Sequence, residues 1–262
     1  MDSRHGFWDN PFMAKTTDPT RKIFKVLAAD RVEEIFQRLK KQRPDPKTEL
    51  NYTNPYTLLV AVALSAQATD ISVNKATEAL FKIADTPQKM LKLGEEKLIT
   101  YISTIGLYRG KAKNVMAMAQ KLIDEHDGEI PRDHTALTKL AGVGNKTANV
   151  VMNEAFGEPT IAVDTHIFRV AHRLDLSCGK GPDAVEHDLH NIIPDKYKRK
   201  AHHWLLLHGR YTCKARVPEC YDCIIRDLCP YEPKTVLVEK KEKPISKTAL
   251  RNRPKLKSVL DK

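Results

Sequence analysis

A lysine and an aspartate lie in two short motifs that could together carry out covalent chemistry. Lys146 belongs to the segment LAGVGNKTANVV, and Asp164 belongs to the segment IAVDTHIFRV, eighteen positions further along the chain. A neutral lysine amine is a nucleophile that attacks electrophilic carbon, provided that its surroundings disfavour the ammonium form. Lys146 is therefore a candidate nucleophile, and Asp164 is its candidate partner.

The turn before Lys146 is rich in glycine and suits a phosphate group. Gly142, Val143 and Gly144 separate two stretches of helical pattern, and the missing glycine side chains let backbone N–H groups approach an anion closely. A helix is predicted from about Asn145, because apolar residues then recur at the spacing of one buried face. These residues are Ala148, Val151, Met152 and Ala155. The positive end of this helix would face the anion and disfavour an ammonium at Lys146.

Both candidate residues also have simpler interpretations. Lys146 could be a phosphate contact and nothing more, and Asp164 could be an ordinary helix N-cap, because it directly precedes a second apolar helical face. That face consists of Ile167, Val170, Ala171 and Leu174. The two motifs alone leave catalysis and these structural roles open.

Four cysteines in the last quarter of the chain form a compact metal-binding pattern. Cys213, Cys220, Cys223 and Cys229 fall within seventeen residues at the spacing C-x6-C-x2-C-x5-C. Disulfides are disfavoured, because the first residues, MDSRHGFWDN, lack the apolar core of a secretory signal. Four thiolates suit a tetrahedral zinc ion and equally suit an iron–sulfur cluster, so the spacing leaves both open. Cys178 lies far upstream and is expected to be an ordinary thiol.

Four separated blocks resemble the endonuclease III family, the bifunctional DNA glycosylases and abasic-site lyases of the helix-hairpin-helix superfamily. The resemblance runs from about residue 27 to residue 231. The blocks are LSAQATDISVNKAT (64–77), TIGLYRGKAKNV (104–115), LAGVGNKTANVV with IAVDTHIFRV (140–170) and HHWLLLHGRYTCKARVPECYDCIIRDLC (202–229). Cysteines at this spacing hold a [4Fe–4S] cluster in that family, so the resemblance implies iron and not zinc.

The resemblance also implies roles for individual residues. Lys146 matches the lysine that forms a Schiff base, and Asp164 matches an essential aspartate. Gln67 matches a residue that fills the gap left by an extruded nucleotide, and Leu107 matches an apolar wedge that offsets part of the cost of unstacking. Considered without the resemblance, Gln67 would be read as a bridge or cap between helices and Leu107 as a core residue.

Further DNA contacts are implied at the turn and at the first cysteine loop. They comprise Gly142, Val143, Gly144, Lys214 and Arg216. Two positions of the turn depart from the family pattern: Ala141 stands where proline is usual, and Asn145 stands where arginine is usual. These changes affect the rigidity of the turn and one cationic contact, and they leave the implied chemistry untouched.

The implied function is base excision repair of damaged duplex DNA. An oxidised pyrimidine nucleotide would flip out, Lys146 would attack C1′ as the base departs, and β-elimination would cleave the strand 3′ to the abasic site. One alternative is the related adenine glycosylase, which lacks a lysine at the nucleophile position. Another is a DNA-binding module without catalysis, in which Lys146 and Asp164 are unused.

The composition agrees with a polyanionic partner but is less specific than the motifs. There are 44 Lys and Arg against 33 Asp and Glu in 262 residues, a formal charge of +11 that predicts salt-sensitive binding. No segment approaches the roughly eighteen apolar residues that a membrane span requires. We therefore expect no membrane partner. By default we further expect a monomer in a bacterial cytoplasm, associated with the nucleoid through DNA binding.

The elements that position these residues are predicted to be helical almost throughout. Asn54 and Pro55 form a good helix start, followed by apolar residues expected on one face. These are Leu58, Leu59, Val62 and Ala66, and a later helix carries Val115, Met118, Ala119 and Leu122 and ends near Asp127. No convincing strand pattern occurs, so the predicted fold class is all-α.

The family architecture implies two helical domains with a cleft that holds Lys146 and Asp164. A six-helix domain with the helix-hairpin-helix is expected at 48–159, and residues 27–47 are expected to pack with 160–231 as the iron–sulfur cluster domain. Residues 1–26 are predicted to be a flexible extension. Residues 232–262 are predicted to be a disordered basic tail.

Overall fold

The computed structural model describes residues 28–236, which fold into eleven α-helices and one short 3-10 helix. The α-helices are α1 (Ala29–Gln42), α2 (Pro55–Leu64), α3 (Asp70–Ile83), α4 (Pro87–Leu93), α5 (Glu95–Ile102), α6 (Tyr108–His126), α7 (His134–Thr138), α8 (Asn145–Phe156), α9 (Thr165–Arg173), α10 (Pro182–Ile192) and α11 (Asp195–Tyr211), and the 3-10 helix is η1 (Cys220–Asp222). These residues contain no strand, which confirms the all-α prediction.

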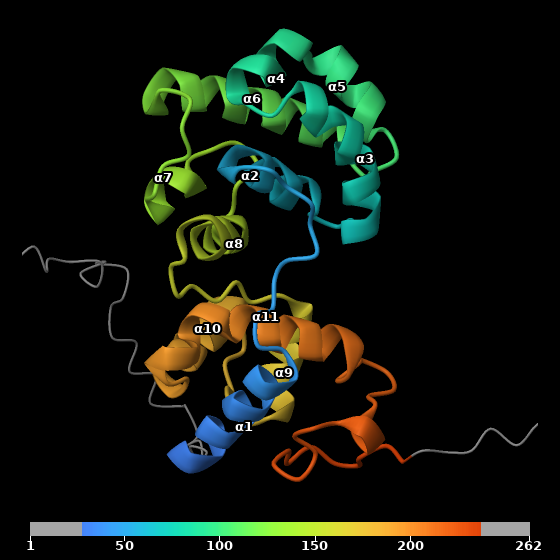
Figure 1. The fold of residues 1–262 in the computed structure, drawn as a ribbon, viewed down its shortest axis with the longest axis vertical. Coiled ribbons are helices and arrows are strands. Elements are labelled where there is room, and N and C mark those ends of the chain that lie inside the picture. The colour runs from blue at the N-terminus through green and yellow to red at the C-terminus, as the bar shows by residue number, and fades with distance from the viewer. Residues whose placement is uncertain (1–27, 237–262) are drawn as a thin grey trace, which may run out of the picture.

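The helices form two lobes with separate apolar cores. The first lobe consists of α2–α8, and its core is built from residues between 50 and 152. In this lobe α2 lies between α8 and the group of helices α3–α6 (Figure 1). Since α2 is surrounded in this way, every residue of the helix except Pro55 and Ala63 is buried.

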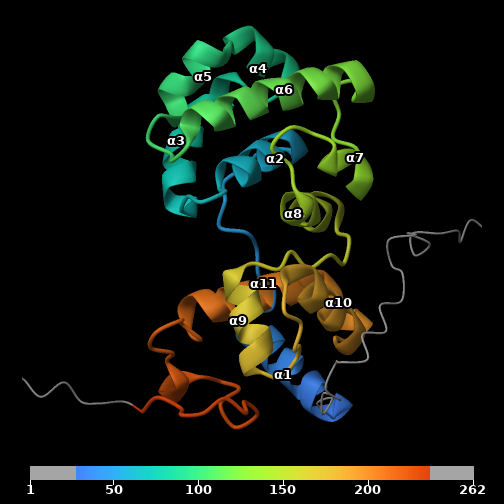
Figure 2. The ribbon, with the colours of Figure 1, turned by 180° about the vertical axis from the view of Figure 1, so that it is seen from behind.

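The second lobe consists of α1 and α9–α11. Its core joins residues 32–39 of α1 to residues between 161 and 225, so the two ends of the described chain meet in one lobe. Phe36 of α1 stacks on Tyr197 of α11 with ring centroids 5.8 Å apart, and Trp204 packs against both rings. The chain crosses between the lobes twice, once after α1 and once after α8 (Figures 1 and 2).

The helix starts and ends predicted around the motifs are confirmed. Asn54 caps α2 through a bond from the Thr57 N–H, α8 begins at Asn145, and α6 ends with Asp127 as its C-cap. The predicted apolar face of α2 was wrong in two respects. The helix is buried on all sides, and Ala66 lies beyond its end, because the chain leaves the helix at Ser65.

Some sequence-based expectations concern residues that the structure does not describe. The predicted extension at 1–26 lies outside the described residues, and only 232–236 of the predicted basic tail lies within them. Among the helices that are described, none has the length and apolar character required to cross a membrane.

Candidate active site

The glycine turn joins α7 to α8 and presents open backbone. Gly142 has a φ of +76°, and a Cβ there would lie 3.0 Å from the Cβ of Asn114, so both conformation and space require glycine. Val143 is buried, and its N–H donates to the Leu140 carbonyl at 3.1 Å. Gly144 is the N-cap of α8, and a Cβ there would meet nothing within 4 Å. The positive end of α8 is therefore accessible to an anion.

Lys146 lies in the first turn of α8, two residues after this N-cap. Its side chain is exposed, and within residues 28–236 it forms no ion pair and donates no side-chain hydrogen bond. A lysine held by a carboxylate would be a poor nucleophile, because the pairing stabilises the ammonium form. The amine of Lys146 is thus available to a ligand at the turn.

Asp164 is the N-cap of α9, as its simpler interpretation predicted. The Oδ1 atom accepts a hydrogen bond from the Ile167 N–H at 2.8 Å. The Oδ2 atom has no partner among the described residues. The cap therefore fixes the direction of the carboxylate and leaves one oxygen available for chemistry.

His202 of α11 is influenced by the charge of Lys146 and by the backbone just before Asp164. Burial lowers the pKa of His202 well below its usual value, and the charges of His203 and Lys146 lower it further. A hydrogen bond with the backbone of Ala162, two residues before Asp164, opposes this shift. The Nδ1 atom of His202 is buried without a partner in the described structure. Sequence reasoning missed this residue, whose only signal was a pair of histidines beside the apolar stretch WLLL in α11.

An open groove of about 570 Å³ brings together Gln67, Leu107 and Gly142. Gln67 has a φ of 55° and Leu107 a φ of 60°, a left-handed conformation that costs free energy for residues other than glycine. Leu107 is also 67% exposed, so its interpretation as a core residue was wrong. Two strained residues, one of them an exposed leucine, thus line the same groove as the glycine turn.

Lys111 of α6 is a buried cation in the wall of this groove. Its side chain is 8% exposed, and its Nζ donates to the Leu64 carbonyl at the end of α2, at 3.0 Å. Burial lowers the pKa of this amine. Sequence reasoning missed Lys111, although it lies four residues before Val115 and so continues the buried face of the helix.

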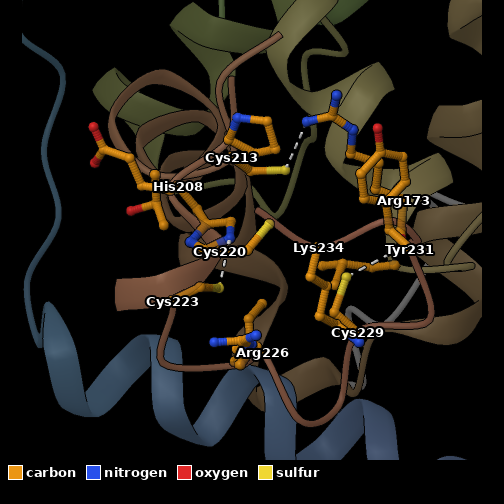
Figure 3. Close-up of a pocket in the computed structure, with 14 residues that line it drawn as sticks. Arg173, His208, Cys213, Cys220, Cys223, Arg226, Cys229, Tyr231 and Lys234 are labelled. Atoms are coloured by element: carbon orange, nitrogen blue, oxygen red, sulfur yellow. Dashed lines mark hydrogen bonds between the residues drawn. The ribbon is translucent and has the colours of Figure 1, made fainter. Parts of the chain in front are cut away.

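The four cysteines of the predicted metal site line one pocket in the second lobe (Figure 3). Burial raises the pKa of the Cys223 thiol to about 11, and the neighbouring cysteines raise it further, although a backbone hydrogen bond from Ile225 opposes this. Burial also raises the pKa of Cys229. Cys178 does not line this pocket. No three His, Cys, Asp or Glu side chains within residues 28–236 are arranged to hold a metal ion as they stand.

Arg173 of α9 connects this pocket to the loop that follows Cys213 (Figure 3). Its Nη1 donates to the Cys213 Sγ at 3.3 Å and to the Lys214 carbonyl at 2.8 Å, and its Nη2 donates to the Ala215 carbonyl at 2.9 Å. Its guanidinium also lies over the Tyr231 ring. The residue supplies positive charge beside the thiols and fixes the path of the loop, and no local sequence signal indicated it.

The loop fixed by Arg173 carries the two remaining predicted DNA contacts. Lys214 and Arg216 are both exposed, and Lys214 forms an ion pair with Glu219 at the far side of the same loop. Arg216 has no partner within the described residues. The structure thus holds these two cations on a loop of the second lobe, while the groove and the glycine turn belong to the first lobe.

Comparisons with known proteins agree with this arrangement. Residues 60–195 match the HhH-GPD superfamily of base excision DNA repair proteins. The chain is 56% identical over 201 residues to endonuclease III of Escherichia coli K12, which covers 77% of this chain and 95% of that protein. It is 56% identical over 205 residues to endonuclease III of Rickettsia conorii, covering 78% and 98%.

The chain is also similar to solved structures of DNA glycosylases. A trapped endonuclease III–DNA covalent intermediate superposes with a TM-score of 0.73 at 44% identity, over 78% of this chain and 96% of that one. A thermostable thymine-DNA glycosylase shares the fold, with a TM-score of 0.69 at 23% identity over 77% and 96% of the two chains. The chain belongs to the endonuclease III family of the HhH-GPD superfamily and is a DNA glycosylase and AP lyase of base excision repair.

Proposed function

We propose that this enzyme removes oxidised pyrimidines from duplex DNA through a Schiff base on Lys146. The free, exposed amine in the first turn of α8, directly after a turn open to phosphate, is the observation that carries the proposal. The amine attacks C1′ of the flipped nucleotide, and the C1′–N bond to the base breaks. The C1′–O4′ bond then breaks and the sugar ring opens, which leaves an imine between C1′ and Lys146. The imine acidifies the C2′ proton, and loss of that proton expels the 3′ phosphate by β-elimination.

In this proposal Asp164 acts through the oxygen that its helix cap leaves available. The carboxylate would stabilise positive charge on the sugar as the base departs, and it would assist removal of a proton from Lys146. The cap at Ile167 supports this role, because it holds the carboxylate in one orientation. A carboxylate repels phosphate, which favours placement of Asp164 toward the sugar rather than toward the backbone.

The groove supports a role in base flipping. We propose that Leu107 enters the duplex as an apolar wedge and that Gln67 fills the space left by the extruded nucleotide. Their exposure and strained backbones are expected of residues that act on a ligand rather than on the core. The backbone at Gly142–Gly144 and the cations Lys214 and Arg216 would bind phosphates on either side of the lesion. Solved endonuclease III complexes with DNA support this partner.

We further propose that the four cysteines hold a [4Fe–4S] cluster. A single zinc ion requires all four sulfurs at about 2.3 Å from one point. The four thiols line one pocket, and their spacing in the sequence, C-x6-C-x2-C-x5-C, resembles that of the family that holds a cluster, which favours iron. Arg173 borders the Cys213 sulfur and would offset negative charge on the thiolates, and the His208 Nε2 lies 3.8 Å from the Cys223 sulfur. The cluster would shape the loop that carries Lys214 and Arg216.

We propose the two-domain organisation that was expected from the sequence. A six-helix domain at 48–159 and a cluster domain formed by 27–47 with 160–231 would close on DNA as one monomer, with Lys146 and Asp164 in the cleft between them. The separate cores of the two lobes support this division. The relatives described above are bacterial, which is compatible with a bacterial cytoplasm.

The test is covalent trapping with borohydride, which reduces an imine to a stable adduct. Wild type, Lys146→Gln and the control Lys139→Gln would each be incubated with a duplex that contains thymine glycol. Lys139 is exposed at the other side of the turn and outside the proposed chemistry. We expect an adduct with wild type and with Lys139→Gln, and none with Lys146→Gln. The absence of an adduct from wild type that demonstrably binds the duplex would contradict the proposal.

A further inference from the structure

Glu186 of α10 reaches across from the second lobe to the first turn of α8. Its Oε1 accepts a hydrogen bond from the Asn149 Nδ2 at 2.8 Å, and its Oε2 lies 3.5 Å from the Asn145 Nδ2. Asn149 is 3% exposed, so its bond is shielded from water. A carboxylate with both oxygens engaged by α8 limits how that helix can rotate or shift.

These two asparagines flank the proposed nucleophile. Asn145 directly precedes Lys146 and Asn149 follows it by three residues, so the two asparagines share one face of the helix beside the lysine. The Asn149 carbonyl also accepts a hydrogen bond from the Thr160 Oγ1 at 2.5 Å. Thr160 begins the segment that leads to Asp164. A network of hydrogen bonds therefore connects Glu186, the turn that carries Lys146 and the chain before Asp164.

Glu186 is a partly buried carboxylate with no cation paired to it within residues 28–236. Helix α8 faces it with two neutral amides, and its own helix presents Asp183, whose Oδ1 lies 3.5 Å from the Asn145 Nδ2. Lys146 forms no ion pair with it. Burial raises the pKa of Glu186 to about 7; hydrogen bonds from Asn149 and Asn145 oppose the rise, and the Asp183 charge adds to it. An arginine at position 145 would add the missing positive charge.

We propose that Glu186 is a positioning residue that orients the Lys146 amine by holding Asn145 and Asn149. The inference depends on the proposed role of Lys146 as nucleophile. The ionised carboxylate accepts hydrogen bonds from both amides. When Glu186 takes up a proton it loses part of this capacity, and the longer contact to Asn145 is the first to weaken. The rate of imine formation should then depend on the state of Glu186, whereas DNA affinity should not.

The experiment measures single-turnover formation of the borohydride adduct between pH 6 and pH 8.5, together with affinity for an uncleaved lesion duplex. Glu186→Ala should slow adduct formation about tenfold or more, because small displacements of a reacting group are costly in rate. Its affinity should stay within about twofold of wild type. Glu186→Gln, which keeps one acceptor oxygen for Asn149 and cannot ionise, should show the lower rate of the protonated form at every pH and lose the pH dependence near neutrality. Glu96→Ala, an exposed glutamate on α5, is the control.

Asn145→Arg provides a second and independent readout. Asn145 is exposed, so this variant should fold even if Glu186→Ala does not. A cation beside Glu186 favours its ionised form, so the rate should persist to lower pH than in wild type. Equal rates and equal pH profiles in wild type, Glu186→Gln and Asn145→Arg would overturn the role of Glu186. A wild type that gives no adduct would instead contradict the assignment of Lys146, and with it the inference.

Discussion

The Nε2 atom of His203 lies 2.6 Å from the Oε1 atom of Glu154, and this contact joins α11 of the second lobe to α8 of the first. Only 2% of the His203 side chain and 12% of the Glu154 side chain are exposed. The neighbouring Asn153 donates to the Arg199 carbonyl of α11 at 3.0 Å. One face of the helix that carries Lys146 is therefore tied to the second lobe by polar contacts.

Loss of this buried pair should destabilise the fold. Glu154→Ala leaves His203 buried without its partner, and we expect a loss of about 3 kcal/mol in unfolding free energy at pH 7. The exposed pair between Lys82 and Glu78 is the comparison, because Glu78→Ala should cost less than about 1 kcal/mol. Urea denaturation of both variants measures the difference, and equal losses would contradict the structural role of the buried pair.

The stability lost in Glu154→Ala should be smaller in acid than at pH 7. Burial acts to raise the pKa of Glu154, but the hydrogen bond and charge of His203 outweigh it, and the pKa is lowered. A carboxyl with a lowered pKa contributes stability above its unfolded value of 4.5, and this contribution is lost as pH falls through the folded pKa. The gap in stability between wild type and Glu154→Ala should therefore narrow in acid.

Glu186→Gln should have the opposite dependence on pH. The pKa of Glu186 is raised from 4.5 to about 7, so the folded state holds a proton that the unfolded state releases. The stability of wild type should then fall between about pH 4.5 and pH 7, by up to about 3 kcal/mol. Glu186→Gln removes this loss. Unfolding measured at pH 4 and pH 8 should show a gain for the variant only at the higher pH.

The two glycines of the turn should respond differently to alanine. Gly142→Ala places a Cβ at positive φ and against Asn114, and we expect a loss of about 1–3 kcal/mol in stability. Gly144→Ala meets open space, so its stability should be close to that of wild type. Its added methyl group would obstruct a phosphate, so its DNA affinity should fall. Thermal unfolding and DNA titration of both variants separate the two effects.

Leu107→Ala should lose activity without losing stability. The side chain is 67% exposed, so truncation should change unfolding free energy by no more than about 0.5 kcal/mol. If Leu107 acts as a wedge, base excision should slow on a fully paired lesion and much less on a lesion in an unpaired bulge, where unstacking costs less. Ile71→Ala, an exposed apolar residue outside the groove, is the matched control. Equal slowing on both substrates would argue against the wedge.

Replacement of single cysteines should distinguish the cluster ligands from Cys178. Cys220→Ser should lose the iron and the visible iron–thiolate absorption, while Cys178→Ser should keep both, because Cys178 does not line the pocket. Elemental analysis of wild type should find about four irons for each chain. Purified wild type that contains one zinc and no iron would contradict the cluster.

Local pattern was sufficient to predict much of this molecule. The start of α8 at Asn145 and the cap at Asp164 follow from the spacing of apolar residues and from the nearest polar group, both of which act within a few residues. The cysteine spacing predicted that four thiols come together, and they line one pocket. The pattern was misleading at α2, where the spacing of apolar residues predicted one buried face and the helix is buried on all sides. The spacing within a helix does not show how many other helices pack around it.

The sequence by itself determined the helical class, the family and the chemically capable residues, since each depends on residue type and short spacing. Tertiary structure alone decided that Gln67, Leu107 and Lys111 share one groove, and that Arg173 holds the loop after Cys213. It also decided that His203 meets Glu154 and that Glu186 reaches Asn149. The hydrogen-bonded and ion-paired partners among these residues lie 37 or more residues apart along the chain, and only the packing of whole helices brings them together.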